Sequence, residues 1–162
     1  MTNTTLHLFK QNFKFSSAHF LIFDDKKAEK LHGHNYRVAV DLRVPTEVEL
    51  KKNGYFIDFN VFKKFIKQEL DLWDEMVLLP QLHKDMKITV KAPSLEVRFR
   101  ERFYVFPESE VVLLPVTNTS VEQLSRLLAE KFLREFQKYG VKALRVRVEE
   151  TVGQAASTQV SL

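Results

Sequence analysis

The chain of 162 residues contains no cysteine. That absence excludes disulfides, thiolate metal ligands and a cysteine nucleophile together. Glycine occurs only 4 times, and none of the glycine-rich nucleotide-binding patterns is present. There is one tryptophan against 14 phenylalanines, which indicates a core built largely from packed phenyl rings.

The chain also lacks a long apolar run and a strong charge. No apolar segment approaches ~20 residues, and the N-terminus has no basic-then-apolar signal pattern, so we expect no membrane association and a cytoplasmic location. The net charge is +4, and the basic residues are scattered. Scattered charge argues against nucleic-acid binding. It suits an anionic substrate such as a triphosphate, although solubility explains it equally well. We expect one domain, residues 1–162.

Periodicity predicts an α+β fold with an antiparallel sheet. Alternating apolar residues predict a strand over 6–19 with a bend or bulge near its middle, another over 36–44, and another over 144–150. A helix is expected to begin at Asn60 as its cap. A second helix is expected to begin at Ser120, with Gln123 completing a capping box and Gly140 as a stop. Between the helices, residues 80–117 predict a β-rich insertion of short strands.

Three histidines form the densest chemical signal. His32 and His34 are two residues apart, so in an extended chain both side chains point to one face, the face of the following apolar positions. His19 ends the preceding strand, and a hairpin-like return would bring it near the pair. Three neutral imidazoles with an open fourth position are typical of a catalytic zinc site. Taken alone, the His-Gly-His tripeptide is more typical of a loop with two hydrogen-bonding histidines. His7 and His83 have no such partners and are interpreted as surface or packing residues.

Glu150 shares its parity with the apolar positions Leu144, Val146 and Val148, whereas Glu149 faces outward. An inward carboxylate is unfavourable unless it meets a donor. A ligand with two adjacent N–H groups would satisfy it through paired bonds. A structural partner such as an arginine would satisfy it equally well.

Five segments together resemble the 6-pyruvoyltetrahydropterin and 6-carboxytetrahydropterin synthase family. They occur in the family's order and span almost the whole chain: Phe15-Ser16-Ser17-Ala18-His19, Leu31-His32-Gly33-His34-Asn35-Tyr36, Ile57-Asp58-Phe59, Asn118-Thr119-Ser120-Val121-Glu122 and Glu150-Thr151. The resemblance implies the tunnelling fold, a four-stranded antiparallel sheet with two helices on one face. It also implies a homohexamer of two trimers with sites at subunit interfaces.

The resemblance further implies a site. The implied substrate is 7,8-dihydroneopterin triphosphate, with zinc on His19, His32 and His34 and with Glu150 anchoring the pterin ring. The stretch that contains Thr119, Ser120 and Glu122 matches the part of the family that helps form the pterin pocket.

Two departures from the family pattern affect the proton-transfer groups. The usual cysteine before His-Gly-His is missing, and Glu29 stands three residues before His32. This spacing resembles the subgroup that uses glutamate in place of cysteine and forms 6-hydroxymethyl-7,8-dihydropterin on the folate route. A solvated charged loop is the alternative reading of Glu29. In place of the family's Asp-His pair the chain has Asp74 and Glu75, and Glu75 is either a second base or an exposed residue at a helix end.

The sequence thus predicts a zinc-dependent lyase that acts on the side chain of 7,8-dihydroneopterin triphosphate, with 6-hydroxymethyl-7,8-dihydropterin as product. One alternative keeps the substrate and forms 6-carboxytetrahydropterin or 6-pyruvoyltetrahydropterin, against which the missing cysteine and histidine count. Another alternative, of a different class, is a catalytically inert scaffold that binds zinc and pterin.

Overall fold

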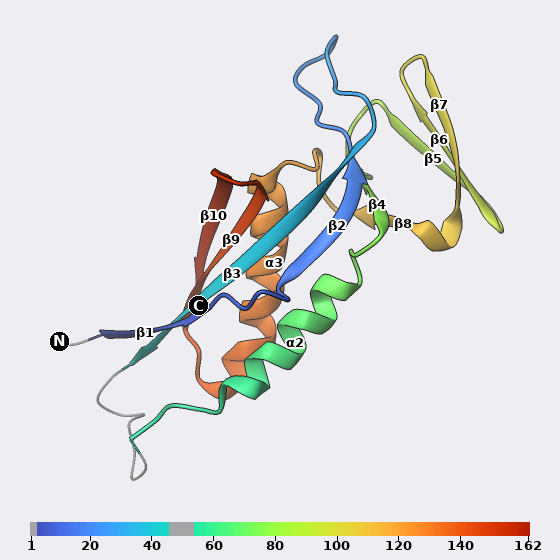
Figure 1. Ribbon diagram of the computed structural model, residues 1–162. Helices are drawn as coiled ribbons and strands as arrows, with labels where there is room; N and C mark the ends of the chain where they lie inside the picture. The colour runs from blue at the N-terminus through green and yellow to red at the C-terminus, as the bar shows by residue number, and fades with distance from the viewer. Residues whose placement is uncertain (1–2, 46–53) are drawn as a thin grey trace.

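The computed structural model describes residues 3–45 and 54–162, which form a large sheet, two helices and a separate small sheet (Figure 1). The large sheet has the order β10-β9-β3-β2-β4-β8, and β1 pairs with the far half of β3. Its strands are β1 (Asn3–Leu8), β2 (Lys14–His19), β3 (His32–Pro45), β4 (Met76–Pro80), β8 (Val111–Leu114), β9 (Ala143–Thr151) and β10 (Gln154–Ser161).

Four antiparallel strands make up the larger part of this sheet, if β1 and β2 are counted as one. β1 and β2 pair with successive parts of β3, so they form one first strand that is interrupted between Leu8 and Lys14. This interruption confirms the expected bend. β3 then pairs with β9, and β9 with β10, all antiparallel.

The predicted four-stranded antiparallel sheet is confirmed, and two parallel strands that the sequence did not predict extend it at one edge. β4 pairs parallel with β2, and β8 pairs parallel with β4. Both extra strands flank the insertion, because the chain leaves the sheet through β4 and re-enters it through β8.

Helices α2 (Phe59–Asp71) and α3 (Val121–Phe136) pack against one face of the large sheet, called here the inner face. The core between them includes Phe15, Tyr36, Val38, Val40, Phe62, Ile66, Leu124, Leu128, Phe132, Val146 and Val148. The predicted alternation of apolar residues is therefore confirmed, since these strand positions all face the helices.

The helix ends agree with the sequence in part. Ser120 caps α3 and accepts a bond from the Gln123 amide, as expected. Asp58, rather than Asn60, caps α2: the Asp58 residue is extended, and its carboxylate accepts the Asn60 N–H at 2.8 Å. Gly140, at φ 91°, ends a short 3₁₀ turn, η2 (Gln137–Tyr139), that follows α3.

The insertion folds as an antiparallel three-stranded sheet, β5 (Met86–Lys91), β6 (Ser94–Phe99) and β7 (Arg102–Pro107), followed by a 3₁₀ turn, η1 (Glu108–Glu110). The expectation of short strands is confirmed. One face of this small sheet packs on residues that follow β2, in a second apolar cluster that contains Phe20, Ile22, Leu79, Met86, Leu95, Val97 and Phe99. The small sheet therefore lies against the segment between β2 and β3, which Figure 1 shows at the same end of the molecule.

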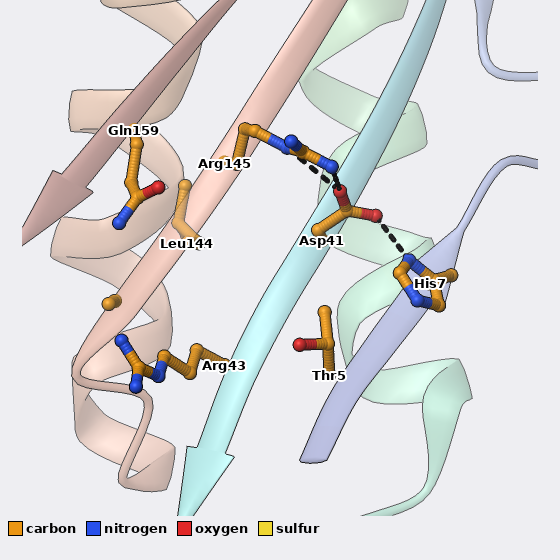
Figure 2. A pocket seen from close by; sticks show the side chains of 8 residues that line it. Thr5, His7, Asp41, Arg43, Leu144, Arg145 and Gln159 are labelled. Atoms are coloured by element: carbon orange, nitrogen blue, oxygen red, sulfur yellow. Dashed lines mark hydrogen bonds and ion pairs between the residues drawn. The ribbon is translucent and has the colours of Figure 1, made fainter. Parts of the chain in front are cut away.

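The outer face of the large sheet, opposite the helices, carries charged side chains. A cavity of about 420 Å³ lies on this face. Within it, Asp41 accepts a hydrogen bond from Arg145 Nε at 3.0 Å, and its Oδ1 lies 2.6 Å from His7 Nδ1; Figure 2 shows these side chains. His7 is therefore an exposed residue whose ring contacts Asp41, and its interpretation as a surface residue is confirmed. Among the helices that the structure describes, none is long and apolar enough to cross a membrane.

Candidate active site

The three histidines meet on the inner face where β2 ends and β3 begins. The antiparallel register pairs His19 with His32 and Ser17 with His34. Directly paired residues share a face, and so do residues two apart on one strand, so all three rings point the same way. The ring centroids are 5.0 Å apart for His19 and His32, 5.3 Å for His19 and His34, and 4.7 Å for His32 and His34.

Backbone carbonyls fix the orientation of two of the rings. His19 Nδ1 lies 3.0 Å from the Thr119 carbonyl oxygen, and His32 Nδ1 lies 2.7 Å from the Lys30 carbonyl oxygen. A carbonyl only accepts, so each Nδ1 carries the proton and donates it. In the neutral rings, Nε2 of both His19 and His32 then holds a lone pair that faces the cluster.

These lone pairs fit a bound cation. One ligand nitrogen from each histidine lies within 4.8 Å of the other two. His19 Nε2 is buried and has no hydrogen-bond partner among the residues that the structure describes; the atom it approaches, Glu150 Oε1 at 3.2 Å, is itself an acceptor. Burial lowers the pKa of His19, against the opposing effect of Glu150, and so favours the neutral ring. A three-imidazole set of this kind suits zinc with an open coordination position.

Glu150 points to the histidines, as its parity predicted. Its Oε1 lies 3.2 Å from His19 Nε2, 3.5 Å from His34 Nε2 and 3.4 Å from the Tyr36 hydroxyl, which donates to it. Burial, together with the negative Glu150, raises the pKa of Tyr36 far above its usual value, so the hydroxyl stays protonated. No arginine contacts Glu150 within residues 3–45 and 54–162, whereas Glu149 pairs with Arg147 on the outer face.

Glu29 lies beside the cluster. Its side chain is one-third exposed, and Oε2 lies 3.6 Å from His32 Nε2. The same oxygen accepts the Leu21 N–H at 3.0 Å, and the Glu29 N–H donates to the Leu21 carbonyl at 2.9 Å. The Glu29 side chain is therefore held by the backbone instead of moving freely in a charged loop. Its catalytic role stays a prediction.

Of the residues at the start of α3, Thr119 contacts the histidine cluster. Thr119 is fully buried, and its hydroxyl as well as its carbonyl lies against His19 Nδ1. Ser120 is used as the helix cap, and Glu122 is exposed in the first helical turn. Substrate binding by these three residues stays a prediction.

Asp74 and Glu75 are not brought to the histidines. Asp74 Oδ1 accepts the Ser16 N–H at 2.7 Å, and the Glu75 N–H donates to the Ser16 carbonyl at 2.7 Å. Glu75 lines a cavity of about 360 Å³ together with Ser16, His34 and Asn35. In the part of the chain that the structure describes, neither carboxylate contacts a histidine ring. A catalytic role for either residue stays a prediction.

Three residues support the site through contacts that the sequence did not predict, although two of them, Tyr36 and Asn118, lie in segments that resemble the family. The Tyr36 hydroxyl donates to Glu150. Tyr36 alternates with His32 and His34 along one strand, and this pattern could have predicted that its side chain lies on the same face. Asn118 holds the segment after His19 by accepting from the Ile22 N–H and donating to the Ile22 carbonyl. Arg102 donates to the carbonyls of Ala28 and Glu29 from the insertion, and no local pattern could have revealed that contact.

Comparisons with known proteins point to one family. The family described as 6-pyruvoyl tetrahydropterin synthase matches residues 8–160. A protein of Methanocaldococcus jannaschii, named as a candidate 6-carboxy-5,6,7,8-tetrahydropterin synthase, is 28% identical over 146 residues, which are 88% of this chain and 87% of that protein. The 6-carboxy-5,6,7,8-tetrahydropterin synthase of Haemophilus influenzae is 31% identical over 75 residues, 46% of this chain and 53% of that protein.

Solved structures share the fold. The crystal structure of 6-pyruvoyl tetrahydropterin synthase from Plasmodium vivax has a TM-score of 0.89 and 24% identity, with 100% of both chains covered. Two further structures of that Plasmodium enzyme are variants of a catalytic residue, in which a glutamate is replaced by alanine or by cysteine, with the same TM-score, identity and coverage. The tunnelling fold that the sequence implied is consistent with this likeness.

Proposed function

The chain belongs to the 6-pyruvoyl tetrahydropterin synthase family, and from this premise we propose that it is a zinc-dependent lyase that converts 7,8-dihydroneopterin triphosphate to 6-hydroxymethyl-7,8-dihydropterin. The observation that carries the proposal is the position of Glu29, whose carboxylate lies 3.6 Å from His32 in a chain without cysteine. A carboxylate beside a histidine cluster is suited to proton transfer.

His19, His32 and His34 would hold the zinc ion through their Nε2 atoms. Thr119 and Lys30 support this role, because their carbonyls keep the opposite nitrogens of His19 and His32 protonated. When bound, zinc supplies a positive charge that acidifies hydroxyl groups of the substrate side chain.

Glu29 would act as the general base. In retro-aldol cleavage, the base takes the proton of the hydroxyl on the second side-chain carbon. The bond between the first and second side-chain carbons then breaks, and a proton is added to the first carbon, which stays on the pterin. The second carbon, whose hydroxyl lost its proton, leaves as an aldehyde. The Leu21 N–H holds Glu29 Oε2 near His32 throughout. The catalytic glutamate of the structurally similar Plasmodium vivax synthase supports this assignment.

The identity of the product tests the proposal. We expect incubation of the metal-loaded protein with 7,8-dihydroneopterin triphosphate to give 6-hydroxymethyl-7,8-dihydropterin, identified by mass spectrometry. Formation of 6-carboxytetrahydropterin or 6-pyruvoyltetrahydropterin instead would keep the substrate and refute the cleavage chemistry. No turnover would favour an inert scaffold that binds zinc and pterin.

Glu150 would anchor the pterin ring, because it is an inward carboxylate beside the candidate metal position and no arginine meets it in the described residues. Glu150→Gln replaces an acceptor oxygen with a donor, and we expect pterin affinity to fall by roughly 1–3 kcal/mol, measured by calorimetry. Glu149→Gln is the matched control, since the neighbouring carboxylate faces outward and pairs with Arg147. Equal losses in the two variants would contradict the assignment.

We further propose a multimer, most simply a homohexamer. The edge strands β10 and β8 leave open pairing positions in one chain, and edges of this kind are usually covered. Asp74 and Glu75 make no direct contact with the histidine rings of their own chain in the described residues, and a neighbouring copy could bring such carboxylates to the site. Light scattering at micromolar concentration should give a mass well above 19.0 kDa; a monomer there would contradict the proposal.

A further inference from the structure

The segment between β2 and β3 carries Glu29 but has little regular structure of its own. Residues 20–31 contain one isolated bridge, between Ile22 and Ala28, and the bonds between Leu21 and Glu29 close its base. The tip of the segment, from Phe23 to Lys27, is exposed. The position of the Glu29 carboxylate therefore depends on whatever holds the base of this segment from outside.

The insertion supplies that support through Arg102, at the start of β7. Its guanidinium donates from Nη1 to the Glu29 carbonyl and from Nη2, at 3.0 Å, to the Ala28 carbonyl. The two carbonyls are consecutive, and one planar guanidinium spans them with two charge-assisted bonds. The carbon of the same guanidinium lies 5.6 Å from the Phe20 ring centroid and 5.7 Å from that of Phe99.

A second arginine and a set of apolar contacts also hold the segment against the insertion. Arg100 bonds the Asp24 carbonyl at 2.6 Å through Nη2, and its Nε donates to Asp85 at 2.9 Å. Phe20, Ile22, Ala28 and Leu31 of the segment pack into the apolar cluster that the small sheet forms. The Phe20 and Phe99 ring centroids are 5.1 Å apart. The insertion thus supplies contacts that hold the segment from outside, in addition to the bonds from Asn118 and Thr119.

We propose that Arg102 is a positioning residue, which holds the Ala28–Glu29 backbone so that the Glu29 carboxylate stays beside His32. Among the described residues, the Arg102 guanidinium bonds two carbonyls of the segment and lies beside two aromatic rings, and it acts through Glu29. The role of the insertion follows: β5–β7 form a rigid platform for the segment that carries the general base. The effect on turnover rests on the proposed function, whereas the effect on the segment does not.

The experiment compares Arg102→Ala, Arg102→Lys and Arg98→Ala in the full-length, metal-loaded protein. Arg98 is the matched control, because it lies on the same small sheet but on its other face, where it stacks on Phe103 at 4.3 Å. Hydrogen exchange measured by mass spectrometry reports residues 20–31, and steady-state kinetics with 7,8-dihydroneopterin triphosphate report turnover. Metal content is measured for each variant.

In Arg102→Ala we expect the amides of Leu21 and Glu29 to exchange roughly tenfold faster, the change that corresponds to about 1.4 kcal/mol. We expect kcat to fall by about tenfold or more with KM within about twofold, because a displaced base affects the chemical step rather than binding. Arg102→Lys keeps the charge but can span the two carbonyls less well, so it should recover part of kcat. Arg98→Ala should match the native protein in both measurements.

Unchanged exchange in residues 20–31 of Arg102→Ala would overturn the proposal, whatever happens to turnover. Faster exchange with full kcat would overturn the positioning role, and so would a loss of kcat that follows a loss of metal. If Arg102→Ala does not fold, Arg102→Lys carries the same comparison at smaller amplitude. If Glu29→Gln keeps full activity, the proposed base is wrong, and the exchange result still decides whether Arg102 holds the segment.

Discussion

His34→Ala and His32→Ala are each expected to reduce bound zinc from about one equivalent per chain to a small fraction of it, since a structural or catalytic zinc site with two imidazoles binds far more weakly than one with three. The two rings lie on one strand face with His19, and a ligand nitrogen of each lies within 4.8 Å of the others. Turnover should fall with the metal. Elemental analysis of the purified protein measures the first effect, and a turnover assay the second.

His7→Ala is the control for this experiment. His7 is exposed on the outer face, where it contacts Asp41 in the cavity of Figure 2, far in the fold from the end of β2. Its loss should leave the zinc content unchanged. Unchanged zinc in both His32→Ala and His34→Ala would show that the three rings are not the metal site.

The sequence predicted much of this site because alternation along a strand determines which face a side chain occupies. His32 and His34 share parity with the buried Tyr36, and Glu150 shares parity with the buried Val148. Since β3 pairs with both β2 and β9, residues of like parity on three strands meet on one face. Local periodicity is enough to predict that meeting once the strand order is given by the family resemblance.

Other features depend on tertiary contacts that have no local pattern. β4 and β8 extend the sheet in parallel, which short apolar segments could not reveal. Asp74 and Glu75 follow the end of a helix. Their positions depend on hydrogen bonds to Ser16, which is far from them in the sequence. Arg102 is 73 residues from Glu29 in the sequence, and only the packing of the small sheet brings the two together.

The arrangement of the inner face also explains why the site tolerates buried polar groups. His19 is almost fully buried, yet its Nδ1 donates to the Thr119 carbonyl. Glu150 accepts a hydrogen bond from the Tyr36 hydroxyl. In the described part of the chain, His19 Nε2 is a buried atom without a hydrogen-bond partner, and it is an atom that a metal ion would bind. A buried acceptor without a donor is unfavourable, so metal binding should stabilise the fold as well as serve the reaction.

Glu29→Gln is expected to lower turnover by at least ~10²-fold, the usual low end for loss of a general base, while zinc and pterin binding are kept. The amide oxygen of glutamine can still accept the Leu21 N–H that now bonds Oε2, so the segment should keep its shape. What is lost is the carboxylate's ability to take a proton. The chain has no cysteine, and Glu29 is the carboxylate that lies 3.6 Å from His32. The other carboxylate at the cluster, Glu150, is proposed to anchor the pterin ring.

The matched control for this last experiment is Asp25→Asn, which removes a carboxylate from the same segment at an exposed position paired with Lys84. Steady-state turnover, zinc content and pterin affinity are measured for both variants. A loss confined to turnover in Glu29→Gln, with Asp25→Asn near the native rate, assigns the proton transfer to Glu29. Full activity in Glu29→Gln would transfer that role to Glu75, which lines a cavity together with His34, or to Asp74, which accepts the Ser16 N–H.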